Sequence, residues 1–202
     1  MNKTVAYFLS VVFHPVLIPT YTLYYLLNHN NYFSSTTSPA EKSALYSIIL
    51  LNTFALPVLL SYLLIRKGWV KSFEMAGREE RIVPFITNAL LLLVAYFMMR
   101  SLMLPQIFNL IILGAAGAVV IAVIINFKWK ISIHMIGIGG LVGTFFGLST
   151  FLLVDLRMAI LVSLLIAGIL GTARLTLGSH TPRQIYFGFF VGFFCEYLVL
   201  SI

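Results

Sequence analysis

Charged residues are scarce in this chain. Of its 202 residues only 9% are Asp, Glu, Lys or Arg, and 60% are hydrophobic. The mean hydropathy is +1.01, whereas about a quarter of the residues of an average soluble domain are charged. This composition excludes an ordinary soluble protein and predicts a polytopic membrane protein. No polar stretch is long enough for a separate soluble domain, so we expect one integral-membrane domain over residues 1–202.

Cysteine and acidic residues are also rare. The single cysteine, Cys195, cannot form an intrachain disulfide. Among the six acidic residues only Glu79 and Glu80 are adjacent, which disfavours the magnesium-dependent prenyltransferases and alcohol phosphotransferases, because those enzymes need paired Asp-rich motifs. We therefore expect no Asp-rich magnesium site of that kind. The first apolar run is not preceded by a strongly basic segment and is not followed by a cleavage site of small residues. We therefore expect a first membrane span there and not a cleaved signal peptide.

Long apolar runs dominate the chain. Separated by short polar breaks, they predict an all-α fold, a polytopic membrane bundle of about six to seven transmembrane helices. The runs lie near residues 5–27, 43–65, 83–100, 105–126, 133–153, 158–176 and 184–202.

Basic residues gather on one side of the predicted bundle. If seven spans alternate, ten of the 13 Lys and Arg residues fall on one face: Lys3, Arg66, Lys67, Lys71, Arg78, Arg81, Lys128, Lys130, Arg174 and Arg183. The positive-inside rule makes this basic face cytoplasmic, in a bacterial inner (plasma) membrane. Cations recruited to a binding site would enrich the same face, so the side of the membrane stays open. We expect the net charge of +7 to meet membrane lipids and no nucleic acid, because the cations cluster where anionic headgroups lie.

Two histidines fall on the basic face as well. The segment ARLTLGSHTPRQ, residues 173–184, joins the last two predicted spans and contains Arg174, His180 and Gln184. The segment KWKISIHM brings Lys130, Ser132 and His134 to the start of the fifth span. Arginine forks, lysine charges and donors at a helix N-terminus all suit a phosphate group.

The spacing of these residues resembles the type 2 phosphatidic acid phosphatase superfamily, membrane lipid phosphatases related to vanadium haloperoxidases. That family carries Lys-x6-Arg-Pro, then Pro-Ser-Gly-His, then Ser-Arg-x5-His-x3-Asp. The third motif is matched by Arg174, five residues, His180, three residues and Gln184. Ala173 replaces the Ser of this motif, and Gln184 replaces its Asp.

The second motif is matched in part. Ser132 and His134 keep the family's spacing, whereas Ile131 and Ile133 replace its Pro and Gly. The resemblance covers most of the chain from residue 71 onward, in order, and all three motifs fall on the basic face.

The first motif is matched least well. Lys71, six residues and Arg78 agree with it in the segment KSFEMAGREERIVP, but Glu79 follows in place of Pro. Arg81, shortly before Pro84, is the alternative arginine. The choice between Arg78 and Arg81 stays open at this point.

The resemblance implies a metal-independent phosphatase that needs no other cofactor. It would hydrolyse a lipid phosphomonoester or diphosphate through a phosphohistidine. The resemblance also implies His180 as the nucleophile and His134 as the general acid that protonates the departing lipid oxygen. The clamp that holds the phosphate would then be Lys71, Arg78, Arg81, Lys130, Ser132 and Arg174. A lipid phosphate is thus the expected partner, and neither the particular lipid nor the oligomeric state is predicted.

Gln184 is the departure with the largest chemical consequence. An Asp in this position would stabilise the positive ring of the nucleophilic histidine, whereas a Gln carbonyl can orient the ring without supplying charge. Two hypotheses follow. The chain is a working phosphatase with a weaker site, or it is an inactive member of the same fold that binds or transports an anionic lipid.

Other unusual residues favour structural roles. Gly139, Gly143 and Gly147 recur every four residues inside an apolar helix, which predicts close helix packing. His14 in the segment FHPVLIP, where prolines should kink the first span, is expected to be a packing or gating residue. Glu196 in the last span has no assigned role.

Overall fold

The computed structural model describes residues 1–29, 32–75 and 77–202, and within those residues the chain is helical and contains no strand. Residues 30 and 31 of the first polar loop and Ala76 of the 66–82 loop lie outside the described residues. The helices in chain order are α1 (Lys3–Val12), η1 (Pro15–Leu17), α2 (Ile18–Asn28), α3 (Tyr32–Thr36), α4 (Pro39–Ile49), the π-helical η2 (Leu50–Ala55), α5 (Leu56–Arg66), η3 (Glu79–Arg81), α6 (Ile82–Ser101), α7 (Gln106–Asn126), α8 (Ile133–Phe151), α9 (Arg157–Thr176) and α10 (Pro182–Val199).

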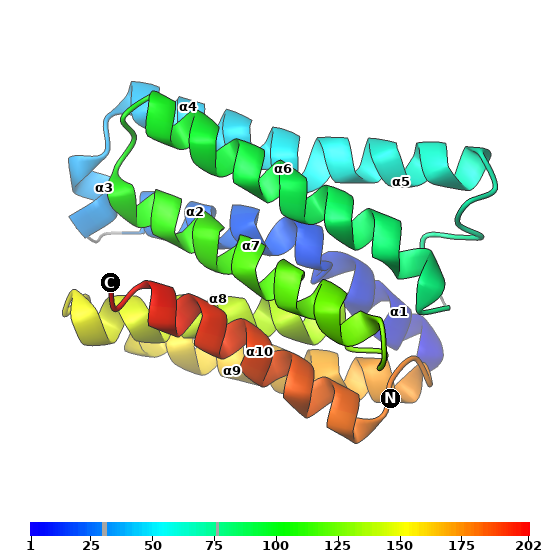
Figure 1. Ribbon diagram of the computed structural model, residues 1–202. Coiled ribbons are helices and arrows are strands. Elements are labelled where there is room, and N and C mark those ends of the chain that lie inside the picture. The colour runs from blue at the N-terminus through cyan, green and yellow to red at the C-terminus, as the bar shows by residue number, and fades with distance from the viewer. Residues whose placement is uncertain (30–31, 76) are drawn as a thin grey trace.

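The predicted helical membrane bundle is confirmed. Six helical stretches of the described chain are long and apolar enough to cross a membrane, and they correspond to the first six predicted runs: Lys3–Asn28, Pro39–Arg66, Glu79–Ser101, Gln106–Asn126, Ile133–Phe151 and Arg157–Thr176. The seventh run forms α10, which is less apolar because it contains Arg183, Gln184 and Glu196. It nevertheless lies along the bundle beside α8. The N- and C-termini lie at opposite ends of the bundle (Figure 1).

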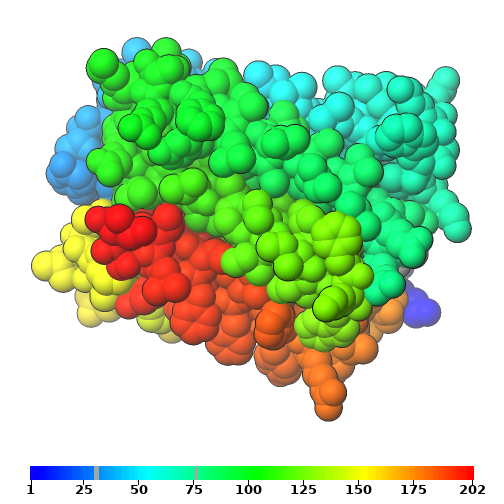
Figure 2. Space-filling view, viewed as in Figure 1, coloured from blue at the N-terminus to red at the C-terminus, as the bar shows by residue number. Residues whose placement is uncertain are grey.

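The helices are stacked in layers. Figure 1 shows α4, α5 and α6 along one side of the bundle and α8, α9 and α10 along the other, with α1, α2 and α7 between them. Among the main contacts between these layers, α7 packs on both α6 and α10 and α1 packs on α9. In the space-filling view α6, α7 and α10 form one broad face (Figure 2). Exposed aromatic side chains on α10, such as Phe187 and Phe194, suit contact with lipid.

Helices α8 and α10 approach each other unusually closely. A Cβ atom added at Gly192 would collide with the carbonyl oxygen of Ile136, and one added at Gly139 would collide with that of Phe189. Gly143 meets the backbone of Phe193 in the same way. The predicted role of this glycine series in helix packing is confirmed, and it brings the middle of α8 directly against the backbone of the middle of α10.

Two of the spans are interrupted. The first span breaks at Phe13 and His14, where α1 ends and Pro15 opens η1. The second contains the π-helical turn η2, with Pro57 just beyond it. Irregular backbone at membrane depth is tolerated where it is buried in protein or lines a cavity, and residues of both interruptions line the same cavity.

Candidate functional site

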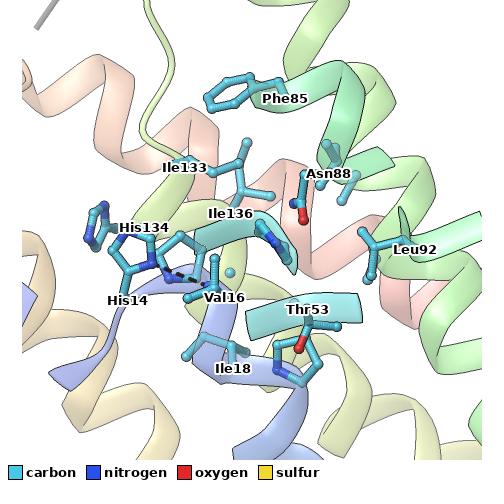
Figure 3. A pocket seen from close by; sticks show the side chains of 18 of the residues that line it. His14, Val16, Ile18, Thr53, Phe85, Asn88, Leu92, Ile133, His134 and Ile136 are labelled. Atoms are coloured by element: carbon cyan, nitrogen blue, oxygen red, sulfur yellow. Dashed lines mark hydrogen bonds between the residues drawn. The ribbon is translucent and has the colours of Figure 1, made fainter. Parts of the chain in front are cut away.

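A cavity of about 170 Å³ lies inside the bundle. Its basic end is lined by Arg81, Arg174, His180, His134 and His14, which come from four separate spans and the loop before α10. Figure 3 shows His14 and His134 next to each other, with Thr53, Asn88 and Leu92 across the cavity from them. Away from the basic end the lining is mainly apolar. The cavity therefore has a cationic end and an apolar interior.

His180 is oriented by Gln184. The Nδ1 atom of His180 lies 3.1 Å from Oε1 of Gln184, and the same oxygen accepts a hydrogen bond from the backbone N–H of Thr181 at 3.1 Å. A backbone N–H is only a donor, so the Gln184 atom that it contacts must be the carbonyl oxygen and not the amide nitrogen. That oxygen can only accept from His180, so Nδ1 carries a proton and Nε2 keeps a lone pair.

The electrostatic surroundings keep His180 neutral. Burial lowers the pKa of His180 to about 3, and the positive charges of Arg81, Arg174 and Lys130 add to the effect. The hydrogen bond with Gln184 opposes these influences without overcoming them. At neutral pH the imidazole is thus uncharged, with Nε2 unprotonated, which is the form in which a histidine acts as a nucleophile.

Three cations lie at or beside this end: Arg81 is buried, and Arg174 and Lys130 are half-buried. None of them forms a salt bridge with a carboxylate among the described residues. Only 4% of Arg81 is exposed, and its guanidinium donates to the carbonyls of Met75 at 2.8 Å and Ile131 at 3.2 Å. The Nε of Arg174 is buried and has no hydrogen-bond partner among the described residues. Burial, together with the charges of Arg81 and Arg174, lowers the pKa of the Lys130 ammonium. Buried cations of this kind attract an anion, since a buried donor without a partner is costly.

His134 and His14 face each other beside these cations. Their ring centroids are 5.1 Å apart in an edge-to-face arrangement. The Nε2 of His134 lies 3.0 Å from the carbonyl oxygen of Ser10, so it carries a proton and donates to that oxygen. The Nδ1 of His14 accepts from the N–H of Val16 at 3.4 Å, which leaves the proton of a neutral His14 ring on Nε2.

The remaining predicted residues lie around the site and do not line the cavity. Lys71 and Arg78 are exposed, and Arg78 donates to the carbonyl of Lys128 at 3.0 Å. Of the two arginines that the first motif left open, the structure brings Arg81 into the cavity. Ser132 is fully buried where α8 begins, with its backbone against Gly188 of α10.

Three titratable residues that the motifs did not assign also line the cavity: His14, Glu74 and Glu196. The prolines around His14 marked a break in the first span, and that break is what brings the imidazole to the cavity. Glu74 exerts its charge on Arg174 from an exposed loop position. No sequence signal pointed to Glu74.

Comparison of the chain with protein-family models, with curated proteins and with solved structures found no match. The described residues contain no group of three or more His, Cys, Asp or Glu side chains arranged to hold a metal ion.

Proposed function

We propose that this protein is an integral-membrane phosphatase that removes phosphate from a lipid phosphomonoester or diphosphate, with His180 as the nucleophile. The observation that carries the proposal is the hydrogen bond between His180 Nδ1 and Gln184. It leaves a lone pair on Nε2 at the cationic end of a cavity that continues into the apolar interior. A lipid phosphate needs both environments, because its headgroup is anionic and its chain is apolar.

In this scheme Nε2 of His180 attacks the phosphorus, and the bond from phosphorus to the lipid oxygen breaks. Arg81 and Arg174 bind the phosphoryl oxygens and stabilise the charge that develops on them. A water molecule then attacks the phosphohistidine, releasing inorganic phosphate and restoring the free imidazole.

His134 supplies the proton to the departing lipid oxygen. Because Nε2 of His134 already donates to Ser10, the transferred proton is the one that Nδ1 carries when the ring is an imidazolium. A bound phosphate dianion favours that charged form. The Nε2–H of His14 is a further donor for a phosphoryl oxygen.

The second candidate is a protein of the same fold that binds or transports an anionic lipid without hydrolysing it. It is favoured by the neutral Gln184, which provides no negative charge to stabilise a positive His180 ring. Both candidates predict binding of a phosphate mimic such as vanadate, and only the phosphatase predicts turnover.

Phosphate release tests the choice between them. The purified protein in detergent with a metal chelator should release phosphate from at least one of phosphatidic acid, phosphatidylglycerol phosphate or a polyprenyl diphosphate. His180→Ala should abolish release and keep vanadate binding. His29→Ala is the matched control, because His29 is exposed and stacks on Tyr25 without lining the cavity. A folded protein that binds vanadate and releases no phosphate would establish the second candidate.

We also propose that the protein lies in a bacterial inner membrane with its basic end toward the cytoplasm. Ten basic residues on one face support this orientation. Single cysteines at Ser35 and Ser72, introduced after Cys195→Ser, report the two faces to an impermeant reagent in intact cells. Labelling at position 35 alone is expected, and labelling at position 72 alone would reverse the orientation.

A further inference from the structure

The deep end of the cavity contains a carboxyl group that the phosphatase scheme does not use. Glu196, on α10, lines the cavity, and only 4% of its surface is exposed. The hydroxyl of Thr144 of α8 lies near this carboxyl group. Its Oε2 atom is buried and has no hydrogen-bond partner among the described residues.

The neighbouring helices leave room for this side chain. A Cβ added at Gly114 of α7 would lie 2.7 Å from Oε2 of Glu196, and one added at Gly140 of α8 would lie 3.4 Å from its Cγ. Any larger residue at Gly114 would displace the carboxyl group. Two glycines on different helices thus create the space that Glu196 fills at the cavity wall.

An incompletely bonded carboxyl group in the interior of a membrane protein is costly. The cavity lining includes apolar side chains such as Leu92 and Ile112 and a few polar ones such as Asn88. None of the described side chains gives Oε2 of Glu196 a hydrogen bond. A purely hydrocarbon chain in the cavity would leave Oε2 without a partner. A ligand chain with an oxygen at this depth would give it one.

The depth of Glu196 sets where that oxygen must lie. Along α8, Gly140 and Thr144 lie six and ten residues beyond His134, which at a rise of 1.5 Å per residue is roughly 9 to 15 Å. In an extended glycerolipid the acyl-ester carbonyl is about seven bonds, or roughly 9 Å, from the phosphorus. This length matches the nearer end of the range, at Gly140, so an ester carbonyl comes within reach of Glu196 when the phosphate lies beside His134.

We propose that Glu196 and Thr144 form a polar subsite that binds the acyl-ester group of a glycerolipid phosphate. The inference deepens the proposed function and rests on it. The substrate class is then an acylated glycerol phosphate, in preference to a polyprenyl phosphate, whose chain carries no oxygen. The protonated carboxyl donates a hydrogen bond to the ester carbonyl, as a Gln side chain in the same place would.

A matched pair of lipids tests the subsite directly. Dioleoyl phosphatidic acid and its dioleyl diether analogue share the headgroup and chain length and differ in the two ester carbonyls. For the wild-type protein kcat/KM should be about tenfold higher for the ester, as expected for one hydrogen bond. Glu196→Gln should keep this ratio, and Glu196→Leu should bring it close to one. Phe194→Leu, on the lipid-exposed side of the same helix, is the control and should leave the ratio unchanged.

The outcomes separate the inference from the proposed function. Equal rates for ester and ether in the wild type, or a ratio unaffected by Glu196→Leu, would overturn the subsite and leave the phosphatase intact. If neither lipid is hydrolysed, the phosphatase proposal fails. The preference for the ester over the ether is then measured from the Kd values of the two lipids, by displacement of a fluorescent phosphatidic acid. An ester preference that depends on position 196 would then still support the subsite.

Discussion

Replacing Gln184 with Glu changes one atom of the site and adds one charge. The substitution keeps the side-chain length, so the carboxylate still accepts from the N–H of Thr181, and the helix-capping arrangement at the start of α10 persists. The new negative charge lies where Oε1 now lies, 3.1 Å from Nδ1 of His180. Gln184→Glu thus restores the charge that the resemblance expects from an Asp without shortening the side chain.

The size of the effect follows from the geometry. A carboxylate this close to an imidazole favours the charged ring and raises its pKa by about 1 to 3. Starting from a pKa of about 3, His180 in the variant should remain largely neutral at pH 7 and begin to titrate above pH 4. A pKa rise of 1 corresponds to about 1.4 kcal/mol of stabilisation of the charged ring. Because part of this stabilisation is realised in the transition state, we expect kcat/KM to rise about tenfold.

Two measurements check the reasoning. In a nanodisc sample with ¹⁵N-labelled histidine, the His180 resonances of the wild type should not move between pH 5 and 8, whereas those of Gln184→Glu should begin to shift toward pH 5. Phosphate release at pH 7 should increase in parallel. A wild-type His180 that titrates near pH 6.5, or a variant whose pKa and rate are both unchanged, would refute the assignment of Gln184 as the residue that orients the nucleophile.

Three further predictions use the same structure. His14→Phe keeps the edge-to-face contact with His134 and removes the Nε2–H that would donate to a phosphoryl oxygen. The inhibition constant for vanadate should therefore rise about three- to tenfold, and an unchanged constant would exclude His14 from the phosphate site. Gly192→Ala should destabilise the protein by about 2 kcal/mol or more, because its Cβ meets backbone, whereas Gly168→Ala, with open space around it, should not lower the thermal midpoint in detergent. Finally, because the folded pKa of His180 is about 3 and the unfolded value is near 6.5, stability should fall as pH decreases from 6.5 toward 3, by at most about 1.4 kcal/mol per pH unit. Denaturation of His180→Phe should show a weaker pH dependence over this range, and equal slopes for the two proteins would contradict the depressed pKa.

The positions of the helices could be predicted because hydrophobicity alone decides them. Apolar runs bounded by Pro39, Pro105 and Pro182 became helices whose first residues differ from the predicted ones by only a few positions. Interruptions within a span were harder to predict. His14 and Pro15 signalled the break in the first span. The π-helical turn Leu50–Ala55 was not predicted, although Asn52 and Thr53 lie within it and Pro57 follows it.

The candidate site was predictable to the extent that motif spacing reflects position along a helix. Arg174, His180 and His134 were expected at one end of the bundle, and the structure brings them to one cavity. Spacing could not distinguish Arg78 from Arg81, because the two lie in consecutive turns at the start of the third span. Tertiary contacts make the distinction, since Arg81 is directed inward by the carbonyls of Met75 and Ile131.

The contacts of Gln184 explain how a residue that departs from the family pattern fits this site. Its carbonyl oxygen serves two donors, the N–H of Thr181 at the start of α10 and Nδ1 of His180. The first contact fixes which end of the amide faces the histidine, and the second therefore fixes the tautomer. An alanine at this position would lose both contacts, whereas an aspartate, one methylene shorter, would have to shift toward one donor or the other. The length of the side chain, and not only its charge, thus determines whether His180 presents Nε2 to the cavity.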